Sequence, residues 1–62
     1  MAYLVVWAVP GGHEIARQSF DELGTATAEA DRRAIAFVDT LGSIIAKVLD
    51  ESGNQISIKI CG

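Results

Sequence analysis

Apolar residues gather in four short stretches, separated by turn residues and by one longer segment with a helical repeat. The first stretch, residues 3–9, is rich in β-branched and aromatic side chains and ends at residues 10–12, Pro-Gly-Gly. Residues 13–20 mix apolar and charged positions and form the second stretch. Proline presets φ and glycine accepts a positive φ without steric cost, so this pattern predicts two strands joined by a hairpin turn.

The segment from about Thr27 to Leu41 repeats its apolar residues at intervals of three and four. One stripe at this spacing contains Ala30, Ala34, Phe37, Val38 and Leu41. The stripe predicts an amphipathic helix with one buried face. Thr25 or Thr27 can cap its N-terminus, and Gly42 stands where a left-handed C-cap belongs.

Two further strands are predicted after the helix. Residues 44–49 are mostly apolar, and residues 50–54 have the composition of a turn. Ile56, Ile58 and Ile60 then alternate with Ser, Lys and Cys, a pattern typical of a half-buried strand. The order β-β-α-β-β predicts a single domain over residues 1–62 with a two-layer α/β (α+β) fold. One helix packs on one face of a four-stranded, largely antiparallel sheet.

The short length limits how this fold is stabilised. A chain of 62 residues buries only about 60% of its unfolded surface. Cys61 is the only cysteine, so an internal disulfide is excluded, and no Cys/His cluster offers four zinc ligands. Half of the residues are apolar, which leaves a dense core and self-association as the expected sources of stability.

Charge and hydropathy bear on the partners. Eight Asp and Glu face five Lys and Arg, and the net charge of −3 argues against direct nucleic-acid binding, which needs a basic patch. The apolar run 2–9 is too short to span a membrane and lacks the features of a signal peptide. We therefore expect a soluble cytoplasmic protein that binds neither nucleic acid nor membrane.

The residues that carry chemistry do not form a catalytic pattern. His13-Glu14 would open a zinc-binding H-E-x-x-H motif only with a second histidine at position 17, where Arg17 stands. The glycines of residues 10–12 precede a predicted strand rather than the helix of a phosphate loop. Cys61 and the serines lack a base placed beside them. We expect no enzyme, no metal and no cofactor; the turn 50–54 has oxygen ligands but lacks EF-hand spacing.

Alternate residues of the first predicted strand form two apolar rows. Tyr3 and Trp7 share one face of the sheet and could stack single-stranded bases, but the acidic charge and the element order argue against that role. Their row is therefore either core or a dimer face. Because one helix covers only one face of the sheet, we also expect a homodimer or partner contact through the other. The candidate self-association residues are Tyr3, Val5 and Trp7.

Acidic residues concentrate at one end of the predicted fold. If consecutive elements run antiparallel, six of the eight carboxylates lie where the second strand meets the helix start and the third strand turns into the fourth. These residues are Asp21, Glu22, Glu29, Asp31, Asp50 and Glu51. Such a cluster attracts a basic partner and speeds its association, although turns and helix N-termini favour the same residue types for structural reasons.

The chain resembles the small phage-encoded α/β anti-CRISPR proteins in size, charge and element order. The matching stretches are the aromatic-bearing hairpin 3–20, the Ala-rich helix from Ala28-Glu29-Ala30 through Leu41, and the hairpin 44–60. It is equally similar to small bacterial domains of the same β-β-α-β-β order.

The anti-CRISPR resemblance implies a stoichiometric inhibitor in the bacterial host cell. Such an inhibitor occupies a basic nucleic-acid channel of a type I CRISPR effector complex, with carboxylates in place of DNA phosphates. The six acidic residues would then be the DNA-mimicking groups. The alternative from another class is a small self-associating structural or regulatory module with an unknown partner.

Overall fold

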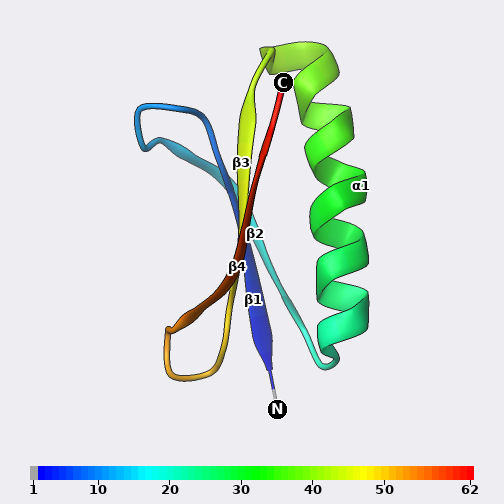
Figure 1. Ribbon diagram of the computed structural model, residues 1–62, viewed down its shortest axis with the longest axis vertical. Coiled ribbons are helices and arrows are strands. Elements are labelled where there is room, and N and C mark those ends of the chain that lie inside the picture. Colours follow the sequence, from blue (N-terminus) through cyan, green and yellow to red (C-terminus); the bar gives the residue numbers. More distant parts are fainter. Residues whose placement is uncertain (1) are drawn as a thin grey trace.

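The computed structural model describes residues 2–62, which form one sheet and one helix. The elements are β1 (Tyr3–Ala8), β2 (Glu14–Phe20), α1 (Leu23–Leu41), β3 (Ile44–Leu49) and β4 (Gln55–Cys61). Figure 1 shows α1 lying along one face of the four strands. The predicted β-β-α-β-β order and two-layer fold are confirmed.

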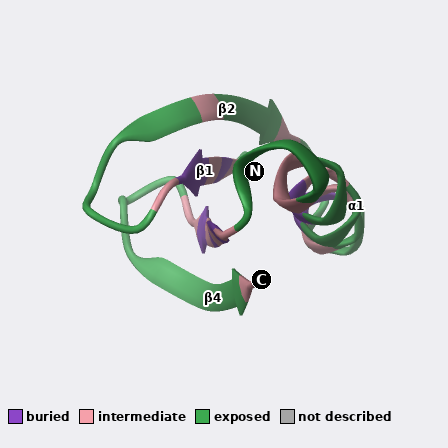
Figure 2. Cartoon of the chain, turned by 90° about the horizontal axis from the view of Figure 1, so that it is seen from above, coloured by how far each residue is buried: buried purple, intermediate pink, exposed green. Residues whose placement is uncertain are grey.

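The strand order in the sheet is β2-β1-β3-β4, and every neighbouring pair is antiparallel. The two most apolar strands, β1 and β3, therefore pair in the centre, while β2 and β4 form the edges. In Figure 2, β2 and β4 are exposed along most of their length, and the buried segments lie between them. The helix packs mainly over the two central strands.

Trp7 on β1 is the largest residue of the core and is fully buried. Its ring meets Phe37 edge-on at a centroid distance of 6.1 Å, and the guanidinium carbon of Arg33 lies 5.2 Å from its ring centroid. The helix presents mainly small residues to this ring, so it can lie close to the sheet. The buried helix residues are Ala26, Ala30 and Ala34.

The helix begins at Leu23, four residues before the predicted start at Thr27. Both predicted caps are wrong: Thr25 and Thr27 lie inside α1, and the Thr27 hydroxyl donates to the carbonyl oxygens of Leu23 and Gly24. The first turn forms because Ala26 extends the buried alanine stripe by one more turn onto the sheet. The predicted C-cap is confirmed, since Gly42 has φ 91° and its N–H donates to the carbonyl of Val38.

The row containing Tyr3, Val5 and Trp7 belongs to the core. Val5 and Trp7 are fully buried on the helix side of the sheet, and Tyr3 packs against them. The prediction that these side chains form a self-association surface is therefore wrong for this fold, because α1 covers them.

The fourth strand also differs from its prediction. Its alternating isoleucines indicated a half-buried strand, yet every residue from 55 to 60 is exposed. The strand order places β4 at an edge of the sheet, away from the central strands that the helix mainly covers, and its isoleucines lie on the face opposite the helix.

Candidate functional site

The face of the sheet opposite α1 has no covering element among residues 2–62 (Figure 1). Because Val5 and Trp7 point to the helix, the intervening residues of β1 point to this open face. The strand register continues from Val6 to Arg17 on β2, and in the other direction to Lys47 on β3 and Ile58 on β4. Directly opposite residues share a face, so these four residues form one row across the sheet.

The open face is mostly apolar. Its apolar side chains come from β1, β3 and β4, and are Leu4, Val6, Ile45, Leu49, Ile58 and Ile60. Lys47 lies half-buried in the middle, and within residues 2–62 no carboxylate pairs with it. Arg17, the other cation of the row, donates hydrogen bonds to the carboxylate of Glu14. These bonds lower the pKa of Glu14 and raise that of Arg17. The sequence did not predict that Lys47 and Ile45 lie on this face, because the order of the strands in the sheet cannot be read from it.

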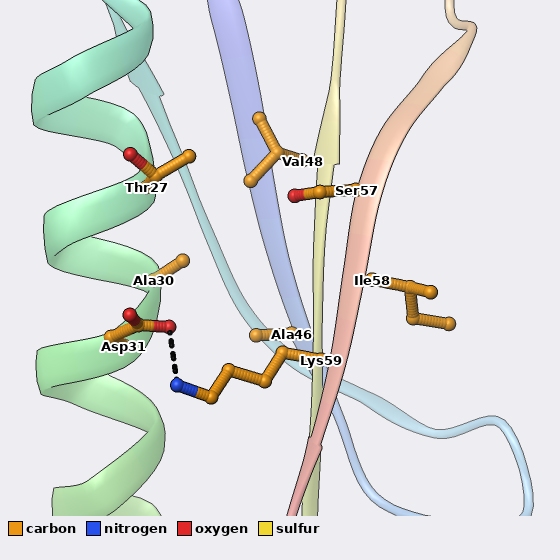
Figure 3. Close-up of a pocket in the computed structure, with 8 residues that line it drawn as sticks. All are labelled: Thr27, Ala30, Asp31, Ala46, Val48, Ser57, Ile58 and Lys59. Atoms are coloured by element: carbon orange, nitrogen blue, oxygen red, sulfur yellow. Dashed lines mark ion pairs between the residues drawn. The ribbon is translucent and has the colours of Figure 1, made fainter.

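The isoleucines of β4 are the most exposed part of this face. The exposed fractions of Ile56, Ile58 and Ile60 are 42%, 49% and 73%. Figure 3 shows the side chain of Ile58 pointing away from α1, whereas Lys59 reaches toward the helix. The strand thus turns its apolar side to solvent and its polar side to the core layer, the reverse of a covered strand.

A groove of about 290 Å³ separates α1 from β4. Its lining residues are Thr27, Ala30, Asp31, Ala46, Val48, Ser57, Ile58 and Lys59 (Figure 3). Lys59 Nζ and Asp31 Oδ1 lie 3.2 Å apart across it, so the two opposite charges in the groove are paired. No histidine or cysteine lines the groove, and its chemistry is that of an incompletely covered sheet edge.

Four of the six predicted acidic residues lie at one end of the molecule. Asp21 and Glu22 form the β2–α1 connection, and Asp50 and Glu51 belong to the β3–β4 turn; both connections lie at the lower end of Figure 1. Glu29 and Asp31 do not lie at the predicted junction of the second strand with the helix start, because α1 starts at Leu23 and carries them further along its axis.

Most of these carboxylates already have partners inside the molecule. Glu29 accepts hydrogen bonds from Arg32, which lowers the pKa of Glu29, and Asp31 pairs with Lys59. Asp50 Oδ1 accepts the backbone N–H groups of Ser52 and Asn54, both at 2.9 Å, and so shapes its turn. Glu51 Oε1 accepts the N–H of Ala2 at 2.6 Å. Asp21 and Glu22 are exposed.

His13 and the glycines before it form the predicted hairpin turn. The N–H of Gly12 donates to the carbonyl of Val9, and Gly11 and Gly12 have φ values of 109° and 101°. His13 is exposed, and Cys61 is half-buried at the end of β4. Among residues 2–62, no group of three or more His, Cys, Asp and Glu side chains could hold a metal ion.

Comparisons of the chain with protein-family models, curated proteins and solved structures give no match. Within the described residues, no helix is both long and apolar enough to cross a membrane. The functional interpretation therefore rests on two surfaces, the open sheet face with its β4 edge and the acidic end.

Proposed function

We propose that the protein is a small non-catalytic module that self-associates through β4 and the adjoining open sheet face. The observation that carries this proposal is the exposure of β4, whose alternating isoleucines face solvent at 42%, 49% and 73%. Fully burying an exposed side chain of this kind is worth about 1.5–3 kcal/mol. Part of each isoleucine is already covered, so association gains a fraction of that value from each of the three side chains.

The size of the domain also supports self-association. The helix contributes three buried alanines and few large side chains to the core, so the monomer has little apolar volume to stabilise it. Oligomerisation is a common way for domains of this length to gain stability. A module of this kind acts by bringing copies of itself, and whatever each copy binds, into one assembly.

The test is the solution mass over a concentration series, measured by analytical ultracentrifugation. We expect the chain of 6.6 kDa to sediment as a multiple of its monomer mass and to dissociate on dilution. Ile58→Lys should shift the population to monomer. The matched control is Ile15→Lys on β2, the opposite edge of the sheet, where the side chain is 38% exposed. A wild-type chain that stays at 6.6 kDa at the highest concentration would contradict the proposal.

A second candidate function is inhibition of a nucleic-acid-binding effector through the acidic end. The observation that favours it is the position of Asp21, Glu22, Asp50 and Glu51 in two connections at one end, where none of the five Lys and Arg side chains lies. This function keeps the DNA-mimicking role that the anti-CRISPR resemblance implies, with four carboxylates instead of six.

Its test is a competition assay with type I CRISPR effector complexes and labelled target duplex at two salt concentrations. Salt-sensitive loss of DNA binding at stoichiometric protein is expected. Reversing Asp21 and Glu22 to Lys should restore DNA binding, whereas the control Asp39→Lys on α1 should not. Asp50 is left intact because it holds its turn together. Inhibition that survives the double reversal would contradict the acidic-end function.

A further inference from the structure

We infer that two copies of the chain pair antiparallel along β4, with the two-fold axis at Ile58, to form one continuous eight-stranded sheet. This inference rests on the proposed self-association and specifies its geometry. It commits to a second copy as the partner of the β4 edge, and to one register.

The outer edge of β4 is suited to adding a strand. β4 has seven residues, no proline and one charged side chain, and its outer backbone groups have no neighbouring strand. Lys59 is the single charged side chain of β4, and it reaches to the helix side of the sheet, where it pairs with Asp31. The other edge, β2, carries the Glu14–Arg17 ion pair between its own residues. Each edge strand has one irregularity in its pairing, near Ala8 for β2 and near Leu49 for β4, so irregularity does not distinguish them. The more charged edge, β2, is the protected one, and β4 is the open one.

The side chains of β4 select the register. With the axis at Ile58, each Ile56 faces Ile60 of the second copy, the two Ile58 face each other, and Ser57 faces Lys59. Moving the axis to Lys59 would set two lysines directly opposite, which is destabilising. An axis at Ser57 would leave Ile60 opposite Asn54 in the turn. The register at Ile58 is the one that pairs all six isoleucines and opposes no like charges.

Lys47 argues against a dimer made by stacking the two open faces. It lies in the centre of that face, and no carboxylate among residues 2–62 pairs with it; Glu14, on the edge strand β2, is already paired with Arg17. Face-to-face stacking would bury two ammonium groups without counter-charges, which is costly. Edge pairing leaves both Lys47 side chains in water and sets each exposed isoleucine of β4 directly beside an isoleucine of the second copy.

The register is tested by charge-swap mixing, monitored by sedimentation. Ile58→Lys and Ile58→Glu should each be monomeric alone, and their equimolar mixture should regain the dimer, because the new charges face each other. The matched control pair is Ile60→Lys with Ile60→Glu. In this register the two copies of position 60 are four residues apart along the strands, about 13 Å, so the control mixture should stay monomeric. Circular dichroism confirms that each variant is folded.

Amide hydrogen exchange of the wild-type chain gives a second readout. Paired β4 edges protect every amide of the strand centre, whereas a face-to-face dimer protects only the alternate amides that bond to β3. A dimer that shows alternate protection, or no rescue in the position-58 mixture, would overturn the edge pairing while leaving self-association in place. A monomeric wild-type chain would overturn both.

Discussion

The indole nitrogen of Trp7 donates a hydrogen bond to the backbone carbonyl of Ala30, 23 residues later, at 3.1 Å. This bond joins the centre of β1 to the middle of α1. It also satisfies the only polar atom of a fully buried side chain, which would otherwise be costly to bury. The bond therefore fixes the position of the helix on the sheet.

Trp7→Phe should destabilise the fold by about 1–3 kcal/mol, because it removes this bond and leaves a small cavity. The measurement is urea unfolding followed by circular dichroism. Arg33→Ala serves as the control: it removes the cation over the same ring but leaves the hydrogen bond, so its effect should be smaller. Equal losses in the two variants would mean that the indole bond contributes little.

Ala34→Leu should cost about 1–3 kcal/mol, since Ala34 is fully buried between α1 and the sheet and does not line the groove. Ala36→Leu is the matched control, because Ala36 is exposed on the same helix. Thermal unfolding of the two variants should show a lower midpoint only for the buried position. An unchanged midpoint for Ala34→Leu would contradict the close packing of the helix.

Gly42→Ala should cost about 1–2 kcal/mol, because Gly42 has φ 91° at the helix C-cap and an L-residue is strained there. Gly24 lies inside the first turn of α1, and a Cβ at that position would meet nothing within 4 Å. Gly24→Ala should therefore stabilise the fold by about 0.5 kcal/mol. Chemical denaturation of the two variants should change the free energy of unfolding in opposite directions. Changes in the same direction would contradict the C-cap role of Gly42 or the helical position of Gly24.

The ion pair of Glu29 and Arg32 should make part of the stability depend on pH. The hydrogen bond from Arg32 holds the pKa of Glu29 below its ordinary value. The pair therefore stabilises the fold fully above the unfolded glutamate pKa of about 4.3, and this contribution is lost as the pH falls through the lowered folded value. In thermal unfolding scans at a series of acidic pH values, the unfolding midpoint of Glu29→Gln should vary less with pH than that of the wild-type chain. If the midpoints of the variant and the wild-type chain change equally with pH, the Glu29–Arg32 pair does not contribute to the pH dependence.

The elements could be predicted from the sequence because their signals are local. Alternation marks the strands, the interval of three and four marks the helix, and Gly42 marks its end. The helix start was missed because Glu22 occupies the N-cap position without a side-chain cap bond. The helix starts earlier because Ala26 packs against the sheet, and no local sequence pattern predicts that contact.

The candidate site was harder to predict because it depends on strand order. The isoleucines of β4 are exposed because they lie on the face opposite α1 and because β3 pairs with β1 and leaves β4 at the edge. The predicted position at the acidic end was correct for Asp50 and Glu51, because the place of a turn between two antiparallel strands follows from chain direction alone. It was wrong for Glu29, because an early helix start moves that residue away from the end.

The fluorescence of Trp7, the single tryptophan of the chain, should report folding separately from association. Trp7 is shielded from water by α1 and lies on the face opposite the exposed isoleucines. Its fluorescence should therefore be blue-shifted and resistant to aqueous quenchers in the folded chain. It should redden on unfolding yet stay constant on dilution, so emission reports folding while light scattering or sedimentation reports assembly. The two equilibria can thus be separated in unlabelled protein.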